Sequence, residues 1–331
     1  MQIKFAAYVF TNVFPIIKLD RPFFFDNNTF AIHKSFSDYF NTSDNAHWKE
    51  WLGTLFWEDI TTRNPLICLT WKETTCTALD HENVSLLDKL NKLYHALLLT
   101  GPWKNDGRQA HSLTGTGEII ENTIKLNNLS EVGHINLWRH SSYYEVDPIW
   151  NWQSQELLNV NSLEKWKTNF SGIEKVISNG SQNLLISLGC MALQSGFHDG
   201  LLDFRIPNFV RAIETVVALP IKTGKVEFAK RTKQLLPSKF TYPLGVDLNT
   251  IDSILENAYQ VRSDCVHGKP FADTLRVTLG TNFSSELPKY ELGIEMAARA
   301  VLENAITNQT ILANSNSRLS LEAAWSKGII L

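Results

Sequence analysis

The stretch that most constrains this chain is residues 246–268, because both its hydrophobic spacing and its end are well defined. Apolar residues recur there at intervals of three and four, which places them on one face of a helix. They are Ile251, Ile254, Leu255, Ala258, Val261 and Cys265. Gly268 supplies a C-terminal stop, and Pro270 cannot continue the helix. The sequence therefore predicts a helix over residues 248–267 that is buried on one side.

Arg262 and His267, near the end of this helix, are the residues whose pairing most suggests chemistry. Five residues along an ideal helix turn through about 140°. Arg262 is therefore expected at the edge of the apolar face and His267 on the polar face. For both to hold one phosphate, either the last turn unwinds before Gly268 or a second copy of the helix completes the site. The second arrangement predicts a homodimer.

Residues 182–308 carry several helix-predicting segments joined by short connections that contain Pro and Gly. The segments are residues 183–196, 204–219, 225–236, 248–267 and 287–308. Helices joined this closely usually form an antiparallel bundle. Residues 309–331 form a tail in which one short docking helix or a frayed end is expected.

Residues 1–150 are predicted to be β-rich with one long helix at residues 84–100. Ile3, Phe5, Ala7 and Val9 alternate with their neighbours, as in a half-buried strand. The remaining predictions are a hairpin at 21–32, strands at 66–71, 119–124 and 134–140, and a loop at 101–117. Residues 151–181, rich in Trp, are expected to join the two parts. The fold class is therefore α+β, with a β-containing N-terminal domain followed by an all-α helical bundle.

The balance of charge restricts how this chain can bind a polyanion. The net charge is −3 and the pI is about 6.3, so any contact with RNA must come from a local basic patch. The candidates are Lys225, Lys230, Arg231 and Lys233. The usual meaning of such a run of lysines is a solvated helix face, and an internal structural role explains Arg231.

The cysteines and the apolar runs indicate the compartment. The four cysteines are far apart and form no C-x-x-C pair, which favours neither a disulfide framework nor a zinc site. They are Cys68, Cys76, Cys190 and Cys265. The longest apolar run, residues 184–193, is shorter than the 20 or so residues that span a bilayer. We expect a soluble cytoplasmic protein with no metal and no cofactor.

The R-x4-H spacing of Arg262 and His267 resembles the HEPN superfamily of helical domains, and within it the Apea-like branch. Two upstream runs extend the likeness. Residues 205–214 are similar to that family's second helix with its Ile-Glu pair, and residues 228–231 are similar to the short run that follows it. The resemblance covers roughly residues 180–307. It implies a HEPN-like bundle that dimerises and cuts RNA without metal in a prokaryotic defence or toxin setting, with the N-terminal domain as sensor or regulator.

The resemblance also assigns roles to residues. RNA carries its own nucleophile, the 2′-hydroxyl, so a base and a stabiliser of the phosphorane are sufficient for cleavage to a 2′,3′-cyclic phosphate. Histidine, with an unperturbed pKa of about 6.5, suits the first role for His267. The planar guanidinium of Arg262 suits the second role. Ser263 and Asp264 are candidate supporting residues, although a solvent-facing position also explains Asp264.

A non-catalytic interpretation stands beside this one. His267 can simply cap the helix, where a C-terminal histidine interacts favourably with the last carbonyls. Arg262 can be paired inside the bundle with Glu214 or Glu256. Many active members of the family carry Asn, Asp or His after the arginine, whereas this chain carries Ser263. The alternative function is therefore a HEPN-like module for dimerisation or for binding RNA or a nucleotide.

Overall fold

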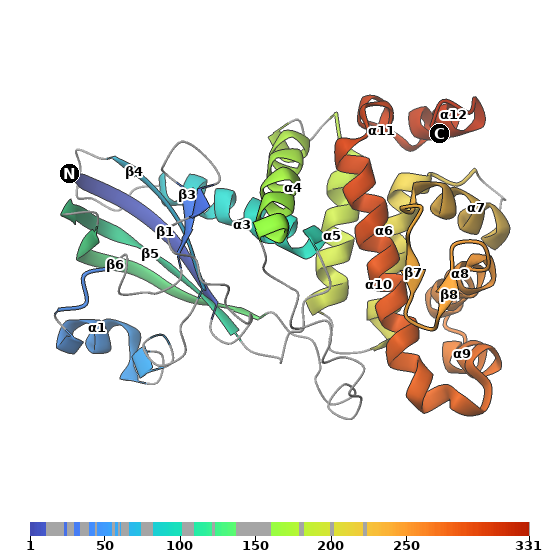
Figure 1. The fold of residues 1–331 in the computed structure, drawn as a ribbon, viewed down its shortest axis with the longest axis horizontal. Helices are drawn as coiled ribbons and strands as arrows, with labels where there is room; N and C mark the ends of the chain where they lie inside the picture. The colour runs from blue at the N-terminus through green and yellow to red at the C-terminus, as the bar shows by residue number, and fades with distance from the viewer. Residues whose placement is uncertain are drawn as a thin grey trace. The chain divides into compact units, whose positions relative to one another are not determined.

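The chain divides into two compact units in the computed structural model, and the division runs through α3 (Glu82–Thr100) and α4 (Val160–Ser178). One unit holds the sheet and the other holds most of the helices (Figure 1). The structure describes residues 1–10, 23–24, 30–33, 40–43, 45–54, 57–58, 60, 66–73, 82–100, 109–120, 123–136, 160–178, 182–198, 202–220 and 224–330. This division supports the predicted α+β class, and each unit is described separately.

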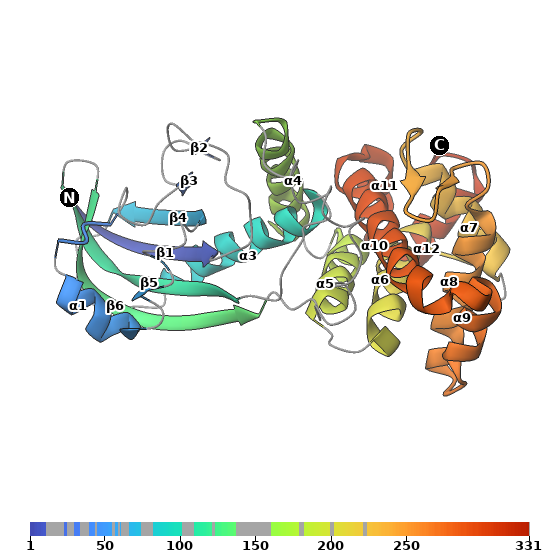
Figure 2. The ribbon, with the colours of Figure 1, turned by 60° about the horizontal axis from the view of Figure 1, so that its bottom comes forward.

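The first unit is built on an antiparallel sheet with the strand order β2-β3-β4-β1-β5-β6. The strands are β1 (Gln2–Phe10), β2 (Phe23–Phe24), β3 (Phe30–His33), β4 (Leu66–Glu73), β5 (Gln109–Ile120) and β6 (Thr123–Asn136). The long strands form one curved layer (Figure 2). β1 lies at the centre, with Phe5 opposite Trp71 of β4 on one side and Gly115 of β5 on the other. The predicted first strand, hairpin and strand at 66–71 are thereby confirmed.

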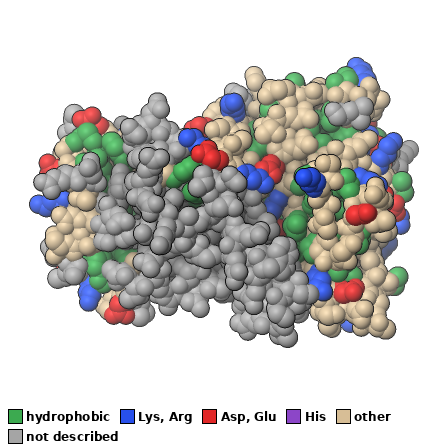
Figure 3. Space-filling model, in the orientation of Figure 1, with side chains coloured by type: hydrophobic (Ala, Val, Ile, Leu, Met, Phe, Trp, Pro, Cys, Tyr) green, Lys and Arg blue, Asp and Glu red, His purple; other side chains and the backbone are tan. Residues whose placement is uncertain are grey.

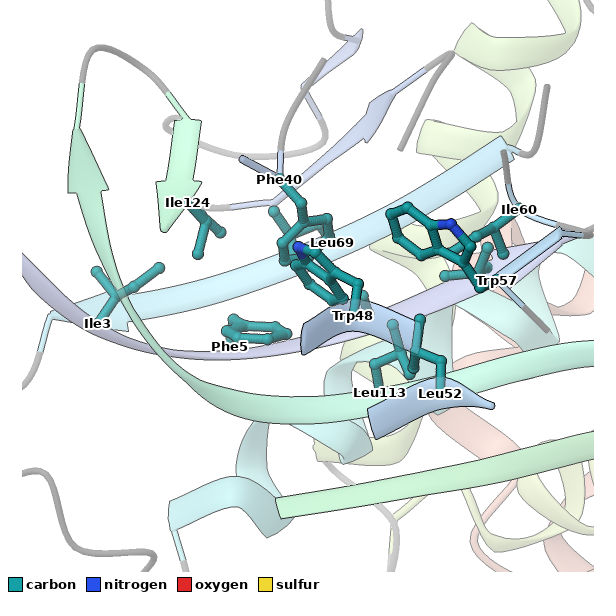
Figure 4. Packing of buried hydrophobic residues seen from close by; sticks show 12 residues of the cluster. Ile3, Phe5, Phe40, Trp48, Leu52, Trp57, Ile60, Leu69, Leu113 and Ile124 are labelled. Atoms are coloured by element: carbon teal, nitrogen blue, oxygen red, sulfur yellow. The ribbon is translucent and has the colours of Figure 1, made fainter. Parts of the chain in front are cut away.

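One face of the sheet carries an aromatic core (Figure 4). Phe5 projects from β1 towards Phe40, whose ring lies 5.3 Å away between centroids. Trp48, on α1 (Asn45–Leu52), packs edge-on to Phe40 at 5.6 Å and stacks with Trp57 at 6.1 Å. Burying such large rings is a major source of stability for a small sheet. α1, which was not predicted, therefore covers this face of the sheet.

The other face of β1 is also buried, which corrects the prediction of a half-buried strand. Lys4, Ala6 and Tyr8 are each no more than 3% exposed. The hydroxyl of Tyr8 donates to Asn91 of α3 at 2.5 Å, so α3 covers this second face. Alternation detected the strand but could not show that a helix lies over the second face. The helix predicted at residues 84–100 is confirmed as α3.

The predicted loop at 101–117 is wrong over its second half, because residues 109–117 belong to β5. The glycine-rich sequence Thr114-Gly115-Thr116-Gly117 suggested a loop, but these residues pair with β6, with two shifts in the strand register. The shifts lie between Thr114 and Gly115 and between Thr116 and Gly117, where bulges are expected at glycine. The predicted strand at 119–124 is divided between the end of β5 and the start of β6.

The second unit is helical, apart from a short ribbon of β7 (Thr241–Tyr242) and β8 (Val246–Asp247) that the all-α prediction did not include. Its other elements are α5 (Leu184–His198), α6 (Leu202–Val217), α7 (Lys225–Leu235), α8 (Asp252–Val266), α9 (Phe271–Leu279), η3 (Gly280–Asn282), α10 (Phe283–Thr307), α11 (Gln309–Asn314) and α12 (Arg318–Ser326). The five predicted helices are confirmed as α5, α6, α7, α8 and α10. α10 packs on α5 and α6, and α8 packs on α6 and α7.

The ribbon is held against α10 by a close contact between Tyr242 and Gly293. Tyr242 is fully buried, and its hydroxyl donates to the carbonyl of Tyr290. A Cβ atom built on Gly293 would overlap the ring of Tyr242. Glycine is therefore required at this position in α10, since any side chain would displace the ring.

Two further predictions change at the ends of the helical part. The Trp-rich join at 151–181 contains α4, in which Leu163, Trp166 and Phe170 are buried at helical spacing. Trp166 donates through Nε1 to the carbonyl of Leu93 at 3.0 Å. The tail at 309–331 forms α11 and α12, and Trp325 of α12 donates to Val216 of α6. In the part of the chain that the structure describes, no helix is long and apolar enough to cross a bilayer.

Candidate functional site

The last turn of α8 remains helical up to His267. The backbone N–H of His267 donates to the carbonyl of Ser263 at 3.1 Å, which is the ordinary helical pattern. Gly268 then takes a positive φ of 65°, and the N–H of Lys269 donates back to Asp264 at 2.8 Å. This is the glycine-terminated end that the sequence predicted. The last turn is therefore not unwound in a way that would bring His267 round to Arg262.

Arg262 forms an ion pair with Glu214 of α6. Its Nε lies 3.0 Å from Oε2 of Glu214, and the two side chains are 26% and 19% exposed. The pair corresponds to one of the two internal partners considered from the sequence. Nε of Arg262 forms no hydrogen bond with any residue that the structure describes, so its contact with Glu214 is an ionic one. Arg262 therefore joins α8 to α6 while part of its guanidinium still faces a cavity.

That cavity has a volume of about 320 Å³ and is formed by four elements of the second unit. Arg262 enters from α8, Arg211 and Glu214 from α6, and Arg318 from α12. The remaining lining residues are Leu185, Leu188, Ala192, Thr215, Ala218 and Leu219. One Nη of Arg318 donates to the carbonyl of Leu219 at 2.6 Å, which fixes that side chain at the cavity wall. Three guanidinium groups thus surround a single carboxylate.

The electrostatics of Glu214 reflect this setting. Burial raises the pKa of its carboxyl above the ordinary value of 4.5, because a buried carboxylate loses the stabilisation that water gives it. Arg262, Arg318 and Arg211 each act in the opposite direction and stabilise the ionised form. The rise in pKa therefore persists despite three neighbouring positive charges.

His267 lies outside this cavity. It is exposed, and its side chain forms no hydrogen bond or ion pair with any residue that the structure describes. With α8 regular to its end, Arg262 and His267 point in directions about 140° apart around the helix axis. Within one chain, the structure does not bring the two predicted catalytic residues together.

Asp264 is buried rather than solvent-facing, which corrects its expected placement. Its carboxylate accepts hydrogen bonds from Gln260 at 2.9 Å and from Thr274 of α9 at 2.7 Å. It therefore ties α9 to the end of α8, and its role is to hold the position of the motif. Ser263 is half-buried, and its hydroxyl has no hydrogen-bond partner among the described residues.

The basic residues of α7 have mixed environments. Arg231 is buried, donates to the carbonyls of Val217 and Ala218 at 2.9 Å each, and pairs with Glu227 at 2.7 Å. It is a structural arginine, so its proposed contact with RNA is wrong. On the face drawn in Figure 3, Lys and Arg side chains are interspersed with Asp and Glu rather than gathered in one patch.

The three lysines of the same run also differ from one another. Lys233 pairs with Asp252 at 2.7 Å, and Lys225 approaches Glu256 at 3.9 Å. Lys230 is exposed and has no ion-pair partner among the described residues. Of the candidate RNA contacts on α7, Lys230 is therefore the one whose charge is not paired with a carboxylate among the described residues.

Arg211 and Arg318 are the site residues that sequence reasoning missed. Arg211 is three residues before Glu214 on α6, so helical spacing could have placed it at the same cavity. Arg318 had no such signal, because it reaches the cavity from the tail, 99 residues after its partner Leu219.

Comparison with known proteins adds no relative. The chain matches no model of a known protein family, no curated protein and no solved structure.

Proposed function

We propose that the protein is a metal-independent endoribonuclease of the HEPN type, with Arg262 and His267 as its catalytic residues. The observation that carries the proposal is the contrast between these two side chains on one helix. Arg262 lines a cavity together with two further arginines. His267, in contrast, is exposed, and its side chain forms no hydrogen bond or ion pair with the described residues. One side chain can hold a phosphate, and the other is accessible for proton transfer.

The proposed reaction needs only groups that the RNA and these side chains supply. The imidazole of His267 takes the proton of the ribose 2′-hydroxyl, whose oxygen attacks the adjacent phosphorus. The guanidinium of Arg262 stabilises the charge on the phosphorane. The bond from phosphorus to the 5′-oxygen then breaks, and that oxygen takes up a proton. The products are a 2′,3′-cyclic phosphate and a 5′-hydroxyl end.

The separation of the two residues requires a homodimer in this proposal. One regular α8 cannot aim both side chains at one phosphate. Two copies related by a twofold axis can place Arg262 of one chain beside His267 of the other, and such an arrangement creates two equivalent sites.

The packing of the family-like runs supports the HEPN-like assignment of the bundle. Glu214, from the run at 205–214, is the partner of Arg262. Arg231, from the run at 228–231, holds the carbonyls at the end of α6. The first run thus contacts the helix that carries the motif, and the second run fixes the end of α6. In the defence or toxin setting that the resemblance implies, the N-terminal domain would sense a trigger or control access.

The test is incubation of the purified protein with RNA in excess EDTA. Cleavage with 2′,3′-cyclic phosphate ends is expected, and an all-deoxy strand of the same sequence should stay intact. His267→Ala should slow cleavage by about 10²–10⁴-fold. Lys327→Ala, which removes an exposed charge on the tail, is the matched control and should cleave at the wild-type rate. Loss of activity in EDTA, or cleavage of the deoxy strand, would contradict the proposal.

The second candidate function is a non-catalytic module that binds RNA or a nucleotide. It is favoured by the ion pair between Arg262 and Glu214, which occupies part of the guanidinium. RNA that is bound by the wild-type protein and remains intact under all these conditions would favour this candidate.

A further inference from the structure

The cavity beside α6 carries an excess of positive charge. Arg211, Arg262 and Arg318 contribute three charges, and Glu214 is the single acidic residue among its lining residues. With Glu214 ionised, two positive charges remain uncompensated. A cavity with this balance attracts a dianion more strongly than a monoanion.

The arginines also retain hydrogen-bond donors. A guanidinium has five N–H groups, and the donation by Arg318 to Leu219 uses one of its two Nη atoms. Nε of Arg262 lies 3.0 Å from Oε2 of Glu214, and no hydrogen bond from its Nη atoms to a described residue is present. Arg211 is exposed and forms no ion pair with the described residues. Donors therefore converge on the cavity from three helices, an arrangement suited to the several oxygens of a phosphate.

The part of the cavity wall that α5 contributes is apolar. Leu185, Leu188 and Ala192 of α5 line it, and Leu188 is 43% exposed, which is unusual for a leucine on a packed helix. A volume of about 320 Å³ lies at the lower end of the range for small-molecule sites. A ligand that fits therefore has an anionic group for the arginines and a flat, weakly polar group for the leucines.

We propose that this cavity binds the terminal phosphomonoester of a nucleotide, either a free nucleoside monophosphate or the phosphorylated end of an RNA strand. A phosphomonoester carries about −1.5 to −2 charges at pH 7, whereas an internal phosphodiester carries one. The terminal group thus matches the two uncompensated charges, and the base matches the leucine wall. The site shares Arg262 with the proposed cleavage reaction, but the binding proposed here needs no bond breaking and no proton transfer by His267.

Calorimetric titration of the full-length His267→Ala protein tests this site without interference from cleavage. AMP is expected to bind, and adenosine, which lacks the phosphate, should bind far more weakly. Arg211→Gln should weaken AMP binding by about 10- to 100-fold, because a charge-assisted hydrogen bond is lost. Lys327→Gln removes an exposed charge outside the cavity and should leave the affinity unchanged.

Two further measurements test which part of the ligand each wall of the cavity binds, and whether the ligand is a free nucleotide or the end of an RNA strand. Leu188→Asn should weaken AMP binding and leave the binding of inorganic phosphate unchanged. A short RNA with a 5′-phosphate that binds better than its 5′-hydroxyl form supports a strand end as the source, and binding of AMP alone supports a free nucleotide. Equal binding of AMP and adenosine, or unchanged AMP affinity in both Arg211→Gln and Arg318→Gln, would overturn the proposal. Neither result depends on whether the wild-type protein cuts RNA.

Discussion

Nε of Arg262 lies 3.0 Å from Oε2 of Glu214, and this contact joins the helix that carries the R-x4-H motif to α6. The pair is partly open to the cavity, and Arg211 and Arg318 lie around the same carboxylate. Glu214 thus positions Arg262 without neutralising the cavity. This arrangement reconciles the internal ion pair with a role for Arg262 in binding phosphate.

Arg262→Ala is expected to lower the free energy of unfolding by only about 1 kcal/mol, because Glu214 keeps two neighbouring arginines. Arg205 provides the contrast, since its ion pair with Glu291 has both side chains at most 5% exposed. Arg205→Ala should cost about 3–5 kcal/mol by removing the guanidinium beside a buried carboxylate. Urea unfolding of both variants measures the difference. Equal losses would show that Arg262 is an internal structural arginine.

Glu214→Gln should alter the pH dependence of stability. The folded pKa of Glu214 is raised above its ordinary value of 4.5 by burial, so between 4.5 and that pKa the folded chain binds more protons than the unfolded chain. The free energy of unfolding therefore falls as pH rises through this window. Glutamine does not titrate, so the stability of the variant relative to wild type should increase from pH 4.5 upwards. Urea unfolding at a series of pH values measures this difference, and a constant or decreasing difference would refute the assignment.

Gly293→Ala should destabilise the second unit by about 1–3 kcal/mol or more, because its Cβ would overlap the ring of Tyr242. Gly224→Ala is the matched control, since a Cβ at Gly224 meets no atom within 4 Å. That variant should stay within about 0.5 kcal/mol of wild type. Thermal unfolding of the two variants compares them directly. Similar melting temperatures would mean that the ribbon does not pack on α10 as closely as described.

The parts of the fold predicted from sequence are those with a clear local period. β1 and α8 each show one, and α8 also has a glycine stop that sets its end. α4 was missed although Leu163, Trp166, Phe170 and later residues repeat at helical spacing, because turn signals on both sides suggested a connecting segment. Local signals therefore located elements more reliably than boundaries between domains.

The candidate site shows a different limit. Arg262 and Glu214 could be considered a pair from sequence because both lie on predicted helices of the bundle, although Glu256 was an equal candidate. Arg318 could not, since it reaches the cavity only after α12 docks on α6 through Trp325. The burial of Asp264 likewise depends on α9, which was not predicted. Contacts made by tertiary packing leave no period in the sequence.

The most direct test of the central claim is complementation between two inactive variants. Arg262→Ala and His267→Ala are unfolded together, refolded as a 1:1 mixture and assayed for RNA cleavage in EDTA. If each site takes Arg262 from one chain and His267 from the other, half of the dimers are mixed and each holds one intact site. The mixture should then recover about a quarter of the wild-type rate. A mixture that forms mixed dimers and stays as inactive as either variant alone would contradict a site shared between two chains.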